Sequence, residues 1–447
     1  MHRLLHHSKV LQLQGLVSLA SLHVPQSGCN AIDTDQRAVF TPRSSVLLPD
    51  ALSPAPILPM WLPLQSARIQ NFRTIRELQL DLRRDVNVLV GTAAADGSNV
   101  LDALAIGLGA YHARLPDTRG RTFSRTDDLR IRAHDTPTQS EASRNPAGSP
   151  GVRLVSTDGV QWARGLGSRR QHDEPAVYDK RVATVADVDP EVDGPRPNTR
   201  LLNRQIDERV LAYLDTPSPE QRPTMPFAAA YGTQRTWLDV PLRETALLNH
   251  FKRFAALDGS LDTSRSFHGV FEWFRLMEDE ERRQKQLRRD FDFCLSDLQW
   301  VRDAFNNAGL RCRNPRVELR PTRMIVDFQH DDETWQPLDF THLSEGDRAH
   351  FSLVLDIARR MVQLNPSDDL NHPDRGTNTV GTVLIDQIEL HLHPDRHYAV
   401  LQSLRAAFPN TQFIVTTRSE GVDASLPREY VQRLVWTDDG IVGADTV

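Results

Sequence analysis

The sequence predicts an α/β fold with a parallel sheet and a ligand site at the carboxyl ends of its strands. Short apolar segments at 86–90 (VNVLV), 381–386 (GTVLID) and 412–417 (QFIVTT) have the composition of strands that are buried on both faces. The first is followed by helical apolar spacing over 98–115. Polar loops directly follow these strands, and such loops are where open α/β sheets bind ligands.

Composition narrows the class of protein. The 447 residues are 39% hydrophobic and 25% charged, which excludes fibrous, collagen-like and membrane-spanning chains. A net charge of -6 gives no general positive field for nucleic acid. The three cysteines have no CxxC spacing, so neither a disulfide framework nor a zinc site is indicated, and we expect a cytoplasmic protein.

The elements follow in order along the chain. Residues 1–60 lack a sustained period and end in a Pro-broken stretch, so we interpret them as a disordered extension; a poor signal peptide is the alternative. Alternating apolar residues over 66–82 predict a hairpin, and 86–90 the first buried strand. Polar tracts near 134–150 and 214–224 bound an insert, with strands at GVRLVS and TMPFAAAYG.

The second half contains a helical region and then more strands. Residues 242–307 show helical patterning, and one stretch within it, 277–301, has charges on one face and Phe291, Leu295, Leu298 and Val301 on another. Its basic run RRQKQLRR indicates a solvated helix, with nucleic-acid contact as the alternative. RVELR and MIVDF are strand candidates, and QFIVTT ends the core that the pattern identifies.

Four loops collect where the site is expected. They are GTAAADGSN at 91–99, LSEGDR at 343–348, VLIDQIELHLHP at 383–394 and FIVTTRS at 413–419. With these residues the sequence resembles the ATP-binding-cassette class of P-loop ATPases, in its SMC-like and RecF-like branch of AAA-family ATP-binding proteins. The likeness extends from about Ser66 to Leu426 and includes ARIQNFRTIRELQLDL and AYGTQRTW. It implies a P-loop NTPase of SMC-head type over 61–447, with an antiparallel β part, a polar insert around 134–224 and a helical subdomain around 242–307.

The resemblance also assigns roles to individual residues. In this family a phosphate loop and a Walker B strand bind ATP, and the signature loop of a second head closes over the phosphates. A Ser and the Walker B Asp hold Mg²⁺, and backbone N–H groups hold phosphate oxygens. The positions that match or border these motifs are, for ATP, Gly91, Asp96, Gly97, Ser98, Asn99, Leu343, Ser344 and Gly346; for Mg²⁺, Ser98 and Asp386; and, beyond Walker B, His393 and Pro394.

Departures from the family pattern affect the chemistry. Gly97 stands where the phosphate-binding Lys is expected, and Asp96 where a Gly is expected. Gln387 replaces the catalytic Glu, and an amide cannot accept a proton; loss of a general base costs about 10²–10⁴-fold in rate. Arg418 replaces the His that usually follows the last strand. Asp is a strong N-cap, so we hypothesise that Asp96 occupies the phosphate donors itself, the alternative being an ordinary helix cap.

The sequence leaves three functions open. The first is a hydrolysis-impaired ATP-binding head that acts as a nucleotide sensor, scaffold or regulatory subunit of a DNA-repair or defence-type complex. The second is an active ATPase completed from elsewhere, for example by Arg235. The third is an interaction module that has lost ATP binding.

Two further expectations concern individual residues. We expect Arg235 either to face the nucleotide or to cap a strand. Glu389, His391 and His393 could form a metal cluster, but HLHP is a family turn. Expected partners are a second head, a nuclease effector and DNA, but no membrane.

Overall fold

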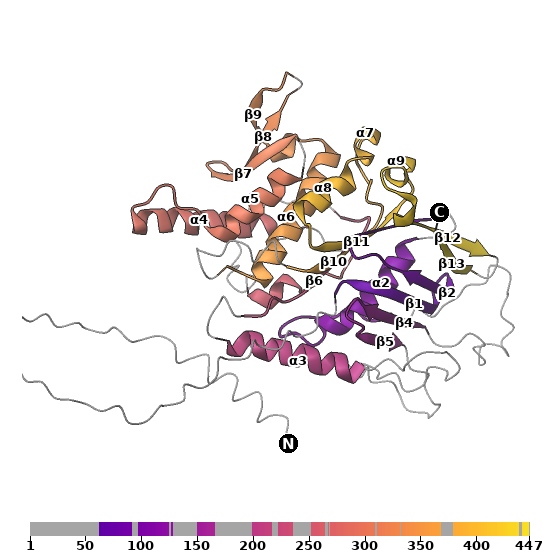
Figure 1. Ribbon diagram of the computed structural model, residues 1–447. Helices are drawn as coiled ribbons and strands as arrows, with labels where there is room; N and C mark the ends of the chain where they lie inside the picture. The colour runs from indigo at the N-terminus through magenta and orange to yellow at the C-terminus, as the bar shows by residue number, and fades with distance from the viewer. Residues whose placement is uncertain are drawn as a thin grey trace, which may run out of the picture. The chain divides into compact units, whose positions relative to one another are not determined.

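A ten-stranded mixed sheet runs through the described part of the chain (Figure 1). The structure, a computed structural model, describes residues 62–91, 97–124, 127, 150–165, 199–216, 222–235, 252–263, 267, 269–308, 311–330, 332–367, 379–437 and 440–446. The expected N-terminal extension and parts of the polar insert and helical region lie outside these ranges. The strands follow the order β5-β4-β1-β2-β13-β12-β3-β11-β10-β6.

The parallel half of the sheet consists of the strands that the apolar pattern predicted. β3 (Val86–Val90), β11 (Thr411–Thr417), β10 (Gly381–Ile385) and β6 (Phe227–Tyr231) lie side by side in parallel, and β12 (Val431–Thr437) pairs with the other edge of β3. In the register, Thr417 lies opposite Val90, and Ile385 lies opposite Val415 and Tyr231. The loops after β3, β11, β10 and β6 therefore meet at one edge, called the carboxyl edge below.

The antiparallel half begins with the expected hairpin. β1 (Leu64–Phe72) pairs with β2 (Ile75–Asp81) and, on its other side, with β4 (Gly151–Ser156), which continues to β5 (Gln161–Gly165). β13 (Gly440–Thr446) pairs with β2 and with β12, so the last two strands join the antiparallel half to the parallel half. The sequence pattern missed β5, β12 and β13.

Helix α2 (Gly97–His112) contacts strands of both halves, and small residues allow the close packing. A Cβ on Gly107 would lie 2.6 Å from Leu154 Cδ1. Helix α6 (Glu345–Leu364) packs with α5 (Ser296–Asn307), with the 3-10 helix η3 (Arg253–Ala256) and with β6. Other described helices are α3 (Thr199–Asp215), which the sequence pattern missed, α7 (Pro394–His397), α8 (Val400–Ala407), α9 (Glu420–Asp423) and the 3-10 helix η6 (Arg428–Tyr430).

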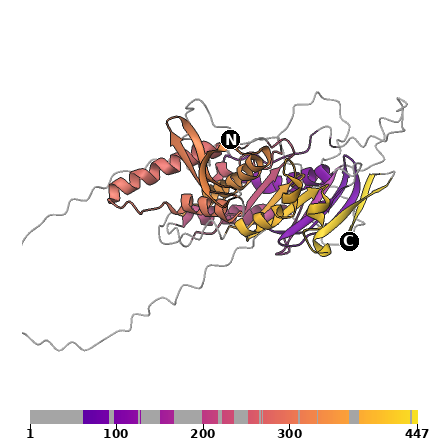
Figure 2. The ribbon, with the colours of Figure 1, turned by 90° about the horizontal axis from the view of Figure 1, so that it is seen from above.

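The helical region contains two helices where the pattern over 277–301 indicated one. α4 (Val270–Arg288) is closed by its C-cap Arg289, whose backbone is left-handed, and α5 begins at Ser296. The expected apolar face is therefore split, and Phe291 is 81% exposed. Figures 1 and 2 agree that α4 extends away from the ten-stranded sheet.

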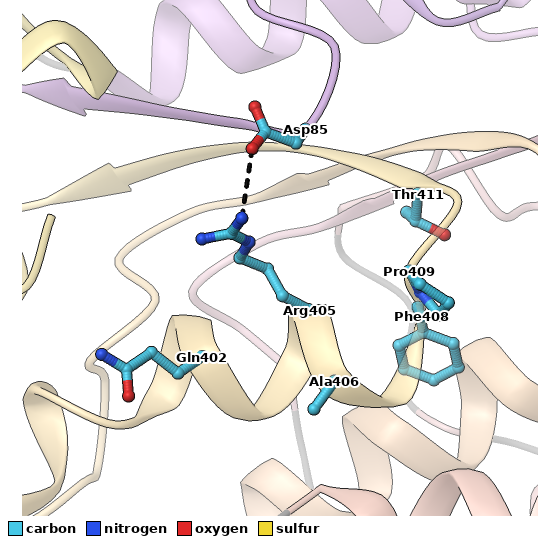
Figure 3. Close-up of a pocket in the computed structure, with 7 residues that line it drawn as sticks. All are labelled: Asp85, Gln402, Arg405, Ala406, Phe408, Pro409 and Thr411. Carbon is cyan, nitrogen blue, oxygen red and sulfur yellow. Dashed lines mark hydrogen bonds and ion pairs between the residues drawn. The ribbon is translucent and has the colours of Figure 1, made fainter. Parts of the chain in front are cut away.

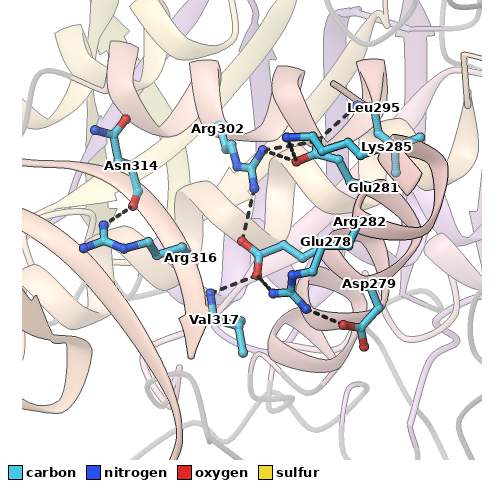
Figure 4. Close-up of polar contacts among 10 residues, drawn as sticks. All are labelled: Glu278, Asp279, Glu281, Arg282, Lys285, Leu295, Arg302, Asn314, Arg316 and Val317. Atoms are coloured by element: carbon cyan, nitrogen blue, oxygen red, sulfur yellow. Dashed lines mark hydrogen bonds and ion pairs between the residues drawn. The ribbon is translucent and has the colours of Figure 1, made fainter. Parts of the chain in front are cut away.

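Buried carboxylates attach α4 to its neighbours (Figure 4). Glu278 accepts from Arg302 of α5, at 3.1 Å, and from the backbone N–H of Val317, at 3.1 Å. Glu281 accepts from Arg302 and from the Leu295 N–H. Val317 belongs to β7 (Cys312–Leu319), which forms a small antiparallel sheet with β8 (Thr322–Gln329) and β9 (Trp335–Asp339). β7 and β8 confirm RVELR and MIVDF as strands; the short 3-10 helix η4 (Phe340–His342) then leads to the signature loop.

Candidate functional site

Asp386, the residue after β10, lies at the centre of the carboxyl edge with both carboxylate oxygens occupied. Ser98 Oγ, in the first turn of α2, donates to one oxygen at 2.5 Å. Thr416 Oγ1, near the end of β11, donates to the other at 2.6 Å. Asp386 is 6% exposed, and its backbone N–H donates to the Tyr231 carbonyl of β6 at 2.8 Å. Three strands and the phosphate-loop helix therefore converge on this carboxylate.

The backbone turn after Asp386 is held by Arg235. The Arg235 guanidinium donates to three carbonyls, those of Gly232 (3.1 Å), Asp386 (2.6 Å) and Gln387 (2.7 Å). Burial lowers the pKa of Arg235 to about 10, partly offset by Asp386 and Glu389. Arg235 was expected either to face the nucleotide or to cap a strand. In the structure its guanidinium donates to backbone carbonyls just beyond the ends of β6 and β10.

Gln387 follows in a left-handed backbone conformation, with φ of 46°. Its backbone N–H donates to Thr416 Oγ1 at 2.8 Å, and its carbonyl accepts from Arg235 and from the Leu390 N–H. Within the described residues its side-chain amide has no hydrogen-bond partner. The main chain of this residue is thus fixed while its amide remains available to a ligand or to water.

The phosphate-loop side is described from Gly97 onward, with Gly91 at the end of β3; Asp96 and the rest of 92–96 lie outside the described residues. A Cβ on Gly97 would lie 2.7 Å from Thr416 Cγ2, so the Thr416 methyl fills the space that a side chain would need. Asn99 turns to the hairpin β1–β2: its Oδ1 accepts from Arg73 at 3.0 Å, and its Nδ2 donates to Thr74 Oγ1 at 2.9 Å.

The signature loop packs directly on the turn that follows Asp386. Leu343 is buried. Gly346 lies so close to that turn that an added Cβ would be 2.3 Å from the His391 carbonyl oxygen, which explains a glycine here. Ser344 caps α6, accepting from the Asp347 N–H at 3.1 Å, and its hydroxyl donates to the Asp347 carboxylate at 2.7 Å. Arg396 of α7 pairs with the other Asp347 oxygen.

Glu389, His391 and His393, which a metal cluster would bring together, have separate partners in the structure. Glu389 accepts from Thr417 Oγ1 and from the Arg418 backbone N–H, both at 2.8 Å. His391 lies 3.6 Å from Glu345. His393 lies 3.2 Å from Asp395 and caps α7. Among the described residues no group of three His, Cys, Asp or Glu side chains could hold a metal ion.

Arg418 occupies the exposed end of the same edge. Its backbone is tied to Glu389, while its guanidinium is exposed and has no ion-pair partner among the described residues.

A buried ionic cluster connects α6 to β6 below the site. The Asp356 carboxylate accepts from Arg359 at 2.6 Å, from Arg360 at 2.7 Å and from the Tyr231 hydroxyl at 2.9 Å. Burial alone would raise the pKa of Asp356, but Arg360 and Arg359 hold it below its ordinary value. Because the Tyr231 carbonyl also accepts from Asp386, this cluster fixes the signature helix and the Walker B strand to each other.

The residues present fit a magnesium ion better than they fit a triphosphate. Ser98 and Asp386 bring a hydroxyl and a carboxylate oxygen to within 2.5 Å of each other, and such hard oxygens are what Mg²⁺ prefers. The cations near the described part of the phosphate side are already engaged: Arg73 with Asp102 and Asp127, and Arg235 with carbonyls.

A surface cavity of about 350 Å³ lies at the amino ends of β3 and β11 (Figure 3). Asp85, Gln402, Arg405 and Phe408 are among its lining residues, and Arg405 pairs with Asp85 at 3.3 Å. This is the opposite end of the strands from Asp386. It is therefore separate from the candidate site.

Sequence reasoning missed three residues that organise the site: Thr416, Asp347 and Arg396. Thr416 and Asp347 lie inside segments that the motifs identified, in FIVTTRS and LSEGDR. A hydroxyl at the carboxyl end of an otherwise apolar strand was the available signal for Thr416. Nothing in the spacing connects Arg396 with Asp347, since 49 residues separate them.

Part of this chain is similar in sequence to parts of two known proteins. Over 158 residues the chain is 33% identical to the Retron Vc95 probable ATPase of Vibrio cholerae serotype O1 biovar El Tor, and over 152 residues 35% identical to the Retron Ec83 probable ATPase of Escherichia coli. The matches cover 35% and 33% of this chain. They span only about a quarter of each relative's length, 26% in both cases.

SMC head domains are among the solved structures that align with this chain. An SmcHead bound to the C-winged helix domain of ScpA aligns with a TM-score of 0.42 and 13% identity, covering 86% of this chain and 98% of that one. The SMC head domain from Thermotoga maritima gives 0.39 and 13%, covering 86% and 99%. Separately, no helix in the described ranges combines the length and apolar character needed to cross a bilayer.

A family model settles the classification. The family described as "AAA domain, putative AbiEii toxin, Type IV TA system" matches residues 86–423, which include β3, the signature loop, β10 and β11. This range contains the Ser98, Asp386 and Thr416 contacts. The chain therefore belongs to this AAA-domain family.

Proposed function

We propose that the chain is an ATP-binding head that retains its magnesium-holding pair but hydrolyses ATP slowly or not at all. The observation that carries the proposal is the contrast between Ser98 and Asp386, which remain in contact, and Gln387, which stands in place of a carboxylate. Bound Mg²⁺ supplies positive charge to the phosphate oxygens. Ser98 and Asp386 would hold it, and Thr416 orients Asp386 through the second carboxylate oxygen.

The loss of hydrolysis follows from two residues. The Gln387 amide can orient a water but cannot accept its proton, which removes general-base catalysis. Gly97 contributes no charge to the phosphates, and we assign the remaining phosphate contacts to backbone N–H groups at the start of α2. Arg418, at the switch position, is a permanent cation and also cannot accept a proton.

The proposed role is that of a nucleotide sensor, scaffold or regulatory subunit in a DNA-repair or defence-type complex. The names of the two relatives, both retron probable ATPases, support a head that uses nucleotide, and a second head is the first expected partner. A nuclease effector and DNA are further expected partners. A head that binds ATP without turning it over stays in one state for as long as the nucleotide remains bound, which suits a sensor.

Equilibrium binding of labelled ATP, with and without Mg²⁺, tests the proposal. We expect Mg²⁺-dependent binding with turnover near background. Asp386→Asn should remove the Mg²⁺ dependence, whereas Asp395→Asn, an exposed acid on α7, should not. Fast turnover by the unmodified chain would instead support the second candidate, an ATPase completed from elsewhere. Absence of ATP binding would support an interaction module that has lost ATP.

A further inference from the structure

A serine and a histidine form a hydrogen bond outside the contacts that hold Asp386. Ser419, two residues after β11, lies with its hydroxyl oxygen 2.7 Å from Nδ1 of His397, the last residue of α7. The other ring nitrogen, Nε2, lies 3.1 Å from the Leu392 carbonyl oxygen. Both members of the pair are partly exposed, so small molecules can reach them.

The Leu392 carbonyl fixes the direction of these hydrogen bonds. A carbonyl oxygen can only accept, so in the neutral imidazole Nε2 carries the proton and donates it to Leu392. Nδ1 is then an acceptor, and the Ser419 hydroxyl donates to it. A hydroxyl that donates to a base, with that base oriented by a third group, is the arrangement that activates a serine as a nucleophile.

The surroundings of the Ser419 oxygen favour negative charge on it. The Gly421 backbone N–H donates to this oxygen at 3.1 Å, and such a bond strengthens when the acceptor loses its proton. This cap of α9 needs only the oxygen, so the hydroxyl proton is left for His397. A Cβ on Gly421 would lie 3.2 Å from His397 Cβ and 3.4 Å from the Ser419 oxygen, so the glycine leaves the space beside the pair open.

A second serine–histidine contact in the chain lacks these features. The Ser403 hydroxyl lies 3.2 Å from His350 Nε2, but it donates to the Val400 carbonyl at 2.8 Å. Ser403 is 8% exposed and His350 5%. Its proton is therefore not directed at the imidazole, and the pair is shielded from solvent. Ser403 provides an internal control for the reactivity of Ser419.

We propose that Ser419 is a nucleophile that accepts acyl groups from activated esters, with His397 as its general base. The serine oxygen attacks the ester carbonyl carbon, and its proton passes to Nδ1 of the imidazole. The bond from that carbon to the leaving oxygen then breaks, and the same proton passes to the leaving oxygen. Water, which gives a proton to the same nitrogen, hydrolyses the acyl-serine and releases the acid; that proton then returns to the serine oxygen.

This activity goes beyond the proposed binding of ATP, since it uses neither Ser98 nor Asp386. The test therefore takes the full chain without nucleotide and treats it with a fluorophosphonate, which forms a stable phosphonyl-serine with loss of fluoride. Peptide mass spectrometry should find the label on Ser419 and none on Ser403. In urea the unfolded chain should lose this preference, because the folded geometry creates it.

Two variants separate the nucleophile from its base. Ser419→Ala should abolish the labelling. His397→Gln removes the base and should slow labelling on the order of a hundred-fold, since an amide cannot take the proton. Hydrolysis of para-nitrophenyl acetate should fall in both variants, and circular dichroism checks that each one folds.

Three results would overturn the proposal: an unlabelled Ser419 in the folded chain, equal labelling of Ser419 and Ser403, or labelling that His397→Gln leaves unchanged. The first two are read on the unmodified protein, so they do not depend on the folding of a variant. Binding of labelled ATP to the unmodified chain reports separately on the proposed function. Either result can therefore fail without the other.

Discussion

Helices α2 and α6 both begin at the carboxyl edge, but their first turns differ in charge. α2 has no acidic residue in its first turn. α6 has Glu345 and Asp347 there, together with the Ser344 cap. An open helix N-terminus attracts anions, and one that carries its own carboxylates does not. The comparison teaches that α6 compensates the positive end of its dipole with its own carboxylates, whereas the first turn of α2 does not.

The two helices also differ in how their middles are held. α2 approaches β4 through Gly107, which leaves room for Leu154. α6 is held by the buried Asp356 cluster. A closely packed helix is destabilised when a substitution adds volume at the contact. A helix held by buried ion pairs is destabilised when a substitution removes one partner of a pair. The predictions below test these two vulnerabilities separately.

The largest effect is expected in the middle of α6. Asp356→Ala leaves two buried guanidinium groups without their carboxylate, and we expect a loss of about 3–5 kcal/mol of unfolding free energy. Tyr231→Phe removes only a hydroxyl from the same cluster and should cost about 1 kcal/mol. Urea denaturation measures both. Equal costs for the two variants would show that the charge pairing is not what holds α6.

A smaller effect is expected at the start of α2. Gly97→Lys places a Cβ against the Thr416 methyl, at 2.7 Å, and overpacking of this kind costs about 1–3 kcal/mol. Thr416→Ser removes that methyl but keeps the hydroxyl that Asp386 needs, so it should recover most of the loss. Denaturation of the single and double variants decides this. If the added Thr416→Ser change recovers no stability, the crowding lies elsewhere.

The same pair bears on enzyme repair. Restoring turnover requires both a phosphate cation and a carboxylate, so Gly97→Lys combined with Gln387→Glu should exceed either single variant in ATP hydrolysis. Adding Thr416→Ser should raise turnover further by relieving the crowding at Gly97. Phosphate release is the measurement. High turnover of the unmodified protein would contradict the premise.

Acid should destabilise both helices through buried imidazoles. Burial lowers the pKa of His112 in α2 to about 3, with Arg360 adding to the effect. It lowers the pKa of His350 in α6 to about 4, with Arg396 and Arg235 adding. The unfolded chain, with a pKa near 6.5, binds these protons first. Stability is therefore present above about pH 6.5 and falls below it, by up to about 1.4 kcal/mol per pH unit for each imidazole.

Denaturation midpoints at pH 7, 6 and 5 measure that slope. His112→Phe should reduce the dependence of unfolding free energy on pH by the contribution of one imidazole. The contribution of His350 should stay the same. A slope that is the same in the variant and the unmodified protein would assign the acid sensitivity to other groups.

The smallest effect is expected at the α6 cap. Ser344→Ala removes the acceptor for the Asp347 N–H and should cost about 1 kcal/mol. Ser344→Thr keeps a hydroxyl and should cost less. Thermal denaturation resolves the difference. An alanine variant as stable as the unmodified protein would show that Arg396, through Asp347, suffices to hold this turn.

The apolar strands and their loops could be predicted from sequence because burial on both faces leaves a strong local signal. β3, β10 and β11 with α2 are such elements, and Ser98 and Asp386 meet as the family resemblance implied. The break after Arg288 was not predictable from periodicity, since the apolar spacing continues across it. β12 and β13 were missed because their role is to join two halves of a sheet. The contacts of Arg235 could not be predicted, because every residue has a backbone carbonyl and the sequence does not show which of them an arginine will reach.

The position of β3 inside the sheet has a consequence for folding. Its two neighbours are β11 and β12, which begin at Thr411 and Val431, more than 300 residues after Val90. Contacts that distant in sequence form slowly. During synthesis the phosphate loop therefore has no completed sheet beneath it until the ribosome has made nearly all of the described chain. We expect the nascent protein to be unable to bind ATP until that point. Until then both edges of β3 are unpaired and accessible to chaperones.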